Sequence, residues 1–389
     1  MTRTSRPDPK IAGAWTLMVT GLRTAELGVF LPSLWLVAAF HAATASIVTA
    51  HGLSLVYPWA DSLTYLAVYV FGMATSSLWV LLPGMIKDLT GAFRGVPAPR
   101  LSQHLERYRR LIVGGLPGAL IFVFALLGNA NLKPAIPALN SALYDGQLEA
   151  WERTLFGGVL PTEWLIKDMS RAAYDFWDYI YGLFGNFILV SLAIALHFKG
   201  TRGGARLITA VCLGYILCTA WALLYPTLGP VYVHPEWFSR FSDSRNAAAV
   251  QLLADHAELY QRNPHVRFVV SGIAAMPSFH VCSWSVCVLC WRVLPRPIFA
   301  FGCLLVLLNW GSTVALGWHY WLDGLAGVAL ALLSWKVACR WVPEPNPAAN
   351  PSANQPTNQP ANQPASDTDP LTVSPATDRQ RWQPAKGNR

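Results

Sequence analysis

The sequence predicts an all-α polytopic membrane protein with about eight transmembrane helices. Of its 389 residues, 53% are hydrophobic and only 13% are charged, and the mean hydropathy is +0.34. A soluble domain carries roughly 25% charged residues, so about half of the usual charge is missing. Apolar runs close to the ~20 residues needed to cross a bilayer recur along the chain. Both observations favour a membrane protein over a large soluble protein with buried core helices.

The apolar runs also predict how the chain is divided. The expected spans are Gly28–Ala50, Leu63–Ile86, Leu111–Ala130, Phe176–Leu196, Leu207–Leu224, Met276–Leu294, Ile298–Leu316 and Leu322–Trp341. They give an N-terminal region with two transmembrane helices (1–110) and a membrane domain with six (111–342). The remainder, 343–389, is rich in Pro, Asn and Gln and repeats the triplet Asn-Gln-Pro. It has almost no apolar residues with which to build a core, so we expect a disordered cytoplasmic tail.

Basic residues between the expected spans predict the orientation of the chain. If there are eight spans, these residues fall on one side, which includes both termini, and the positive-inside rule makes that side cytoplasmic. The opposite segments (51–61, 131–175, 225–275 and 317–321) are mixed in charge. The net charge of +8 is then explained by topology and by attraction to lipid headgroups, and no nucleic-acid partner is expected. The expected location is a bacterial inner membrane.

Two short motifs near the C-terminal end of the chain carry its candidate chemistry. They are Met276–His280 (MPSFH) and Gly317–Asp323 (GWHYWLD). Each begins an apolar run and so places a histidine at the extracytoplasmic membrane surface. Asp323 follows His319 by one helical turn, where side chains of one face meet. An aspartate there can hold the imidazole in one tautomer and stabilise its cation. We therefore interpret His319 as a nucleophile and His280 as an acid and base.

These motifs resemble the second and third signatures of the type 2 phosphatidic acid phosphatase superfamily, usually written P-S-G-H and S-R-x5-H-x3-D. Pro277–His280 is similar to the second signature, and Ser312–Asp323 keeps the spacing of serine, histidine and aspartate in the third. The wider strings Gly272–Ser278 and Gly317–Tyr320 look more like the inositol phosphorylceramide synthase branch, whose members are phosphotransferases. The resemblance covers the six spans from Leu111 to Trp341.

The resemblance implies a six-helix catalytic bundle of the phosphatidic acid phosphatase type, with a phosphohistidine intermediate on His319. Asp323 would orient that histidine. His280 would protonate the departing oxygen and then deprotonate the incoming hydroxyl or water. The residues assigned to phosphate binding are Ser278, Ser312, Thr313 and Gly317. The resemblance implies neither a metal nor a cofactor.

Two departures from the family pattern concern the positive charges that would hold the phosphoryl group. Thr313 stands where the third signature has arginine, and no Lys-x6-Arg-Pro sequence, the first signature, precedes the second. Charge neutralisation of the phosphoryl oxygens is a large part of such catalysis. The candidate replacements are Lys133, Arg171, Arg240, Arg245 and Arg267. The segment Tyr225–Pro230 falls where the first signature would be and is expected, as a strand-like stretch, to shape the site with backbone groups.

Smaller expectations concern the extracytoplasmic surface. Trp318 and Trp321 are interpreted as interfacial anchors, since tryptophan is enriched at that depth. The segment Asn131–Asp175 is expected to form an amphipathic lid. Pro277 suits the first turn of the helix that follows it.

Three classes of function stay open at this point. The preferred one is a lipid phosphotransferase that moves a phosphoryl-containing headgroup from a membrane lipid to the hydroxyl of a lipid or polyol. The alternative is a phosphatase that passes the group to water, with phosphatidate, a sphingoid phosphate or a polyprenyl diphosphate as substrate. A non-enzymatic transporter or scaffold is disfavoured, because the spans carry almost no polar residues at mid-depth and the reactive groups cluster at one face.

Overall fold

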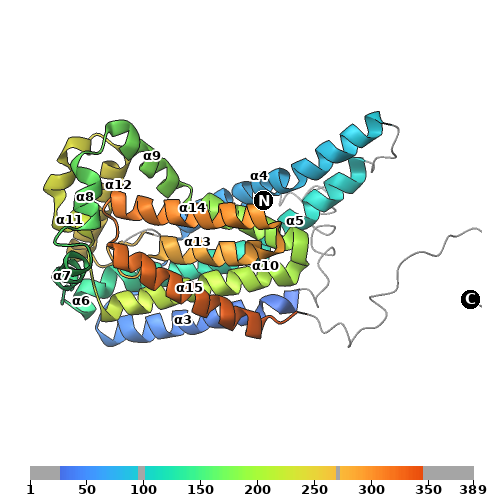
Figure 1. Cartoon of the computed structure of the whole chain (residues 1–389). Helices are drawn as coiled ribbons and strands as arrows, with labels where there is room; N and C mark the ends of the chain where they lie inside the picture. Colours follow the sequence, from blue (N-terminus) through green and yellow to red (C-terminus); the bar gives the residue numbers. More distant parts are fainter. Residues whose placement is uncertain (1–26, 95–100, 269–271, 345–389) are drawn as a thin grey trace, which may run out of the picture. The chain divides into compact units, whose positions relative to one another are not determined.

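The computed structural model describes residues 27–94, 101–268 and 272–344, and these residues form helices and no strand. The tail expected from residue 343 lies outside the described residues from 345 onward. Within the described ranges, six helices are long and apolar enough to cross a membrane. They are α3 (Leu31–Ala50, preceded by the short η1, Gly28–Phe30), α4 (Trp59–Phe93), α5 (Leu101–Leu132), α10 (Phe184–Leu224), α14 (Arg296–Ala315) and α15 (Trp321–Trp341) (Figure 1).

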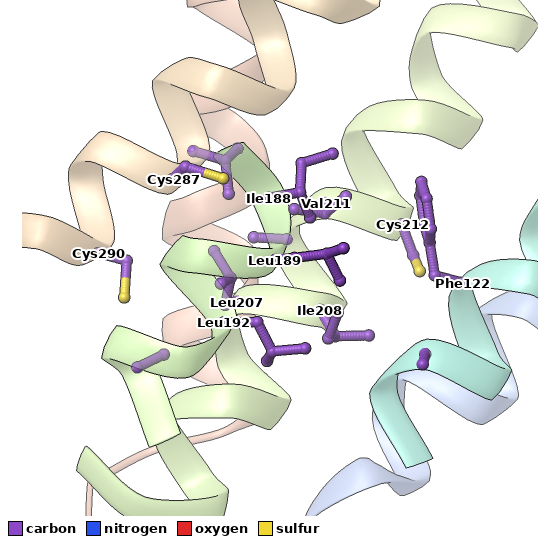
Figure 2. Close-up of a cluster of buried hydrophobic side chains, with 14 of the residues drawn as sticks. Phe122, Ile188, Leu189, Leu192, Leu207, Ile208, Val211, Cys212, Cys287 and Cys290 are labelled. Carbon is purple, nitrogen blue, oxygen red and sulfur yellow. The ribbon is translucent and has the colours of Figure 1, made fainter. Parts of the chain in front are cut away.

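Helix α10 is a hairpin of two helical arms joined at Gly200. Gly200 has φ 61° and ψ −161°, a conformation that only glycine adopts without strain. Ile188 and Leu192 of the first arm pack beside Leu207 and Val211 of the second, all of them buried (Figure 2). The expected span Leu207–Leu224 corresponds to the second arm. The expected span Phe176–Leu196 matches the first arm only from Phe184 onward, because residues 176–182 belong to a separate helix, α9 (Arg171–Gly182).

The expected count of eight spans is not confirmed. The sixth expected span, Met276–Leu294, contains only α13 (Phe279–Cys290), which is followed by the short η4 (Trp291–Val293). At 12 residues, α13 is shorter than a bilayer crossing requires. With the arms of α10 taken separately, the six helices expected in 111–342 are α5, the two arms, α13, α14 and α15.

Short α13 lies at the centre of the helix assembly. Helices α10, α14 and α15 all pack against it (Figure 1). Its residues Val281, Trp284 and Cys287 are buried, and the indole Nε1 of Trp291 donates a hydrogen bond to Ser191 Oγ at 2.9 Å. Most residues of α13 are buried by its neighbours, so little of its surface remains for lipid, which explains how so short a helix can be accommodated.

Helices α3 and α4 pack on α5 and α10, outside the contacts of α13. Helix α5 runs without a break through residues 110 and 111, where the boundary between the two expected regions falls. The N-terminal helices thus share a continuous apolar core with the rest of the described chain.

The short helices gather at one end of the long ones and form what we call the cap (Figure 1). The cap consists of η2 (Lys133–Ala135), α6 (Ile136–Leu139), α7 (Asp145–Leu155), α8 (Pro161–Lys167), α9 (Arg171–Gly182), α11 (Pro230–Val233), η3 (Pro235–Phe241) and α12 (Arg245–Arg262). It has an apolar core of its own, in which Tyr174, Phe241 and Trp318 are buried. The segment 131–175, expected to form a lid, supplies much of the cap.

Trp318 corrects one sequence-based expectation. It is only 9% exposed, and its Nε1 donates a hydrogen bond to Asn246 Oδ1 at 2.6 Å. Trp318 is therefore a core residue of the cap and not an interfacial anchor. The sequence could not reveal this, because the covering residues come from α9 and α12, distant in the chain.

Candidate active site

The two histidine motifs come together where α13 and α15 begin. The backbone N–H of Ser278 donates a hydrogen bond to the carbonyl oxygen of Asp323 at 3.0 Å. Gly327, one turn further along α15, allows this close approach: a Cβ at that position would lie 2.5 Å from the Ser278 carbonyl oxygen. The N-terminal ends of α13 and α15 are thus joined by a backbone hydrogen bond, and their close approach requires glycine at position 327.

His319 is held in one tautomer by the backbone. Its Nδ1 lies 2.6 Å from the carbonyl oxygen of Ala275 and 3.4 Å from Oδ2 of Asp323. A carbonyl oxygen can only accept a hydrogen bond, so Nδ1 carries the proton and Nε2 keeps its lone pair. No group among the described residues bonds to Nε2, and the residue as a whole is 6% exposed. Such a histidine is poised for attack through Nε2.

Asp323 both caps α15 and faces the histidine. Its Oδ2 accepts a hydrogen bond from the Tyr320 backbone N–H at 2.9 Å, as an acidic residue in the first turn of a helix often does. Its Oδ1 is buried and has no hydrogen-bond partner in the described part of the chain. The carboxylate is therefore fixed in orientation, with negative charge directed at the imidazole of His319.

His280 presents a second imidazole to the same space. The ring centroids of His280 and His319 are 5.9 Å apart, in an edge-on arrangement. Tyr181 stacks on His280 at 4.3 Å, and Phe184 lies against it at the same distance. Neither ring nitrogen of His280 makes a hydrogen bond to the described residues. The two imidazoles are thus close enough to act on a single small group between them.

Ser278 occupies the N-cap of α13. Its Oγ accepts a hydrogen bond from the Val281 backbone N–H at 3.4 Å, which leaves the hydroxyl proton available to another acceptor. Because α13 begins at Phe279, Pro277 precedes the cap and does not occupy the first turn of the helix, contrary to expectation. The Met276–Pro277 peptide bond is cis.

The remaining residues assigned to phosphate binding shape the turn that carries His319. The hydroxyls of Ser312 and Thr313 donate to the carbonyls of Asn309 and Trp310, one turn earlier in α14, at 2.7 and 2.8 Å. The Thr313 carbonyl in turn accepts from the backbone N–H of His319 at 3.2 Å. These hydroxyls are committed to backbone carbonyls, so a role in binding phosphate remains a prediction for both.

Gly317 begins the turn between α14 and α15. Its φ of 74° lies in the left-handed region, and the Phe238 ring packs directly on its Cα. Its carbonyl oxygen accepts a hydrogen bond from the Val231 backbone N–H at 2.8 Å. Glycine is therefore required here to turn the chain beneath the cap.

The segment Tyr225–Pro230, expected to shape the site as a strand-like stretch, contacts the first motif but does not form a strand. The Thr227 carbonyl accepts from the Ala275 backbone N–H at 2.9 Å, and Thr227 Oγ1 accepts from the Met276 N–H at 2.8 Å. These bonds fix Ala275, whose own carbonyl holds His319. Thr227 therefore acts on the candidate nucleophile through one intervening residue.

Helix α7 supplies an acidic face that the sequence interpretation missed. Asp145 accepts hydrogen bonds from the backbone N–H groups of Leu228 and Gly229 and from the Tyr320 hydroxyl, all at 2.9–3.0 Å. Glu149 also accepts from the Tyr320 hydroxyl at 3.2 Å, and pairs with His234 at 2.8 Å. The acids follow the i, i+4, i+7 pattern of one helix face, which was the available signal.

Glu152 completes this face and is fully buried. Its Oε1 accepts a hydrogen bond from the Leu322 backbone N–H at 2.8 Å, while Oε2 has no partner in the described residues. Burial raises the pKa of Glu152 from its ordinary 4.5 to about 7, and the nearby charge of Asp323 acts in the same direction. Through these acids, α7 braces the turn between His319 and Asp323.

An apolar cavity opens beside the same turn. It has a volume of about 630 Å³ and lies between α8, α14 and the start of α15. Trp310 and Trp321, stacked with ring centroids 5.0 Å apart, form part of its wall. Trp321 is two residues from His319, so the cavity adjoins the motif. Trp164, which is 71% exposed, also lines the cavity.

Comparison with known proteins supports the resemblance of the motifs. Searches of curated proteins and of solved structures found no match. A family model does match, over nearly half of the chain, and it spans the helices from α7 to α15 together with both histidine motifs. Residues 147–337 thus match the family described as the PAP2 superfamily.

Proposed function

We propose that this protein is a membrane lipid phosphotransferase that acts through a phosphohistidine on His319. One observation carries the proposal: a buried imidazole whose Nδ1 proton is held by the Ala275 carbonyl, so that Nε2 is free to attack, stands 5.9 Å from a second imidazole. The match of residues 147–337 to the PAP2 superfamily supports a phosphatase or phosphotransferase chemistry in general.

In the first step, Nε2 of His319 forms a bond to phosphorus as the bond from phosphorus to the lipid leaving oxygen breaks. His280, protonated at this stage, gives its proton to that oxygen. Because Nδ1 of His319 keeps its proton, the phosphorylated ring carries a positive charge. The buried carboxylate of Asp323, 3.4 Å from Nδ1, stabilises that charge.

In the second step, His280, now neutral, takes the proton of the acceptor hydroxyl. The oxygen of the acceptor bonds to phosphorus while the bond between phosphorus and Nε2 breaks, which returns both histidines to their starting states. Enclosure by Tyr181 and Phe184 places His280 where it can serve departing and incoming groups in turn. Proton transfer of this kind contributes about 10²–10⁴ in rate.

A lipid substrate is supported by the apolar surroundings of the site. The long helices are apolar enough to span a membrane, and the 630 Å³ cavity beside Trp321 is lined almost wholly by hydrocarbon and indole. An acyl or prenyl chain can enter such a cavity while its headgroup lies beside the histidines. The chain then stays in apolar surroundings and the headgroup stays among polar groups.

The distribution of charge supports an extracytoplasmic active site. Lys87 lies near the end of α4, Arg202 beside the turn at Gly200 that joins the arms of α10, and Arg296 at the start of α14, all at the end remote from the cap. By the positive-inside rule, that end faces the cytoplasm and the cap faces outward. The substrate would then be drawn from the outer leaflet, and in a bacterium from that of the inner membrane.

The second candidate function is a phosphatase of the same superfamily, in which water takes the place of the acceptor hydroxyl. His319 is 6% exposed beneath a cap with its own apolar core, and an enclosed site that excludes water favours an organic acceptor. A transporter or scaffold is disfavoured because the histidines and Asp323 are assembled with nucleophile geometry.

The deciding experiment follows the phosphorus of the donor. Purified full-length protein in mixed micelles receives phospholipid donors labelled on phosphorus, with or without added polyols or ceramide. A labelled lipid product that forms only with an acceptor, and not with His319→Ala, is expected. The matched control is His51→Ala, which changes an exposed histidine outside the site. Release of inorganic phosphate regardless of acceptor establishes the phosphatase and rejects the transferase.

A further inference from the structure

The proposed reaction needs positive charge near the phosphoryl oxygens, and the family's usual basic residues are absent from both positions. Five basic residues were candidates from the sequence: Lys133, Arg171, Arg240, Arg245 and Arg267. These five residues differ in whether another protein group already binds their positive charge.

The arginines are all engaged by protein groups. Arg171 pairs with Asp175 and Asp243, and Arg245 forms a two-pronged pair with Asp178 at 3.0 Å. Each of these guanidinium groups already has its anion. Neither has a free charge to offer a substrate.

The other two arginines are held by carbonyl groups and aromatic rings. Arg240 donates to the carbonyl of Ile166 and lies over the Phe241 ring at 4.8 Å. Arg267 donates to the carbonyl of Ser54 at 2.8 Å, to those of Pro264 and Val266, and lies over the Tyr260 ring at 4.3 Å. Both serve to hold the cap and its loops together.

Lys133 differs from all four. Its side chain is partly buried where α5 ends, and its ammonium makes no hydrogen bond or ion pair with the described residues. Its aliphatic stem packs on the loop that leads to His280, because a Cβ added to Gly272 would lie 3.0 Å from Cγ of Lys133. A partly buried cation without an anion is costly unless a ligand completes it.

The end of α5 is held firmly in place. Asn131 exchanges hydrogen bonds with the backbone N–H and carbonyl of Val56, both at 2.9 Å. Asn129 accepts from the Thr219 hydroxyl of α10 at 2.8 Å. The buried amide side chains of Asn129 and Asn131 therefore fix the position of the end of α5, immediately before Lys133.

The loop that leads into the first motif also packs on Lys133. A Cβ added to Gly272 would lie 2.9 Å from the carbonyl carbon of Lys133. Gly272 is three residues before Ala275, whose carbonyl holds His319. Lys133 therefore belongs to the same structural unit as both histidines, although it precedes the segment that matches the family model.

We propose that the ammonium of Lys133 binds the phosphoryl oxygens of the lipid headgroup while its phosphorus lies between His280 and His319. In this position the ammonium neutralises negative charge on the phosphoryl oxygens. In the family pattern, the third-signature arginine and the first signature, both absent here, supply that positive charge. The inference rests on the proposed function for the identity of the substrate. The existence of an anion site beside the histidines can be tested without turnover.

The experiment compares Lys133→Met, which keeps the length of the side chain and removes its charge, with Lys133→Arg in the full-length protein. The matched control is Lys167→Met, which changes an exposed lysine at the end of α8 in the same cap. Initial rates give kcat/KM for a labelled lipid donor. Inhibition by inorganic vanadate and by inorganic phosphate reports on the anion site separately from the lipid tail.

We expect Lys133→Met to lower kcat/KM about 10²–10³-fold, as loss of one group that stabilises developing charge does elsewhere. Its inhibition constants for vanadate and phosphate should rise at least tenfold, while Lys133→Arg recovers part of both and Lys167→Met changes neither. Rates within threefold of wild type, with unchanged inhibition, overturn the proposal.

A second measurement keeps the two proposals apart. Thermal unfolding of the wild type is followed with and without vanadate, then repeated for Lys133→Met and Lys133→Gln. If no lipid donor is turned over, the proposed function fails. Stabilisation by vanadate that both variants abolish still establishes the anion site, and stabilisation that both retain rejects it. If Lys133→Met does not fold, Lys133→Gln and Lys133→Arg carry the comparison.

Discussion

The carbonyl oxygen of Ala275 lies 2.6 Å from Nδ1 of His319, nearer than the carboxylate of Asp323 at 3.4 Å. The backbone, and not the aspartate, is thus the closer restraint on the tautomer of the candidate nucleophile. This arrangement separates two tasks that one aspartate often performs together: the Ala275 carbonyl orients the ring, and Asp323 supplies negative charge to the imidazolium.

Replacement of Asp323 by asparagine tests this division. The Ala275 carbonyl should still hold the proton on Nδ1, and the amide oxygen can still accept from the Tyr320 N–H. We therefore expect kcat to fall about 10²–10³-fold with KM little changed, less than the ~10⁴-fold loss that follows when such a change also selects the wrong tautomer. Steady-state kinetics of Asp323→Asn and His319→Ala provide the comparison. Equal losses for both would show that the carbonyl does not maintain the tautomer.

The close approach of the two motif helices predicts a strict requirement for glycine at position 327. A methyl group there would lie 2.5 Å from the Ser278 carbonyl oxygen, so Gly327→Ala must push α13 and α15 apart. A displacement of this size between catalytic groups lowers the rate by about 10²-fold. The control is Gly185→Ala, because an added Cβ at Gly185 meets no atom within 4 Å. Full activity in Gly327→Ala, with the Tm of wild type, would contradict the contact.

Glu152 predicts a dependence of stability on pH. Its pKa of about 7 in the folded protein exceeds its ordinary 4.5, so between these values the folded protein binds more protons than the unfolded chain. Stability must then fall as the pH rises from 4.5 to 7, by up to about 3 kcal/mol from this group. Thermal unfolding at intervals from pH 4.5 to 8 measures the effect. Glu152→Gln should flatten the curve, and an unchanged slope would remove Glu152 as its cause.

The apolar cavity predicts discrimination between donors by chain length. Leu165→Trp should fill part of the 630 Å³ space and raise KM several-fold for a long-chain donor, while a short-chain donor with the same headgroup is unaffected. Leu143→Trp changes an exposed leucine of the cap that does not line the cavity and serves as control. Equal effects on both donors would show that the lipid tail binds elsewhere.

Features that depend on local geometry could be predicted from the sequence. The apolar runs predicted an all-helical membrane protein, and the four-residue spacing predicted that His319 and Asp323 lie together. They do, at 3.4 Å, although His319 precedes the N-cap Tyr320 and meets Asp323 across the start of α15 instead of along one helix face. The placement of both motifs at one membrane face and the family resemblance suggested that His280 lies near His319, but the 5.9 Å distance between their rings depends on how α13 meets α15. The count of eight spans stays unconfirmed, because α13, with 12 residues, is shorter than an ordinary bilayer crossing and hydropathy alone does not show how its neighbours enclose it.

Contacts between distant segments lay beyond the sequence. Asp145 and Tyr320 are 175 residues apart, and nothing in either neighbourhood indicates that their side chains share a hydrogen bond. From the sequence, Trp318 is predicted to lie at the membrane interface, because the sequence does not show that the cap covers it. The distinction between Lys133 and the four arginines likewise needed the structure, because only the positions of the carboxylates show which charges are already paired.

The most direct test of the central claim is to trap the covalent intermediate. Full-length protein is mixed with a lipid donor labelled on phosphorus and quenched within one turnover, and its peptides are analysed for the label. We predict a label stable to alkali and labile to acid on the peptide that contains His319, lost in His319→Asn and retained in the control His51→Ala. Turnover of the donor without label on that peptide, or label that persists in His319→Asn, would contradict the phosphohistidine mechanism.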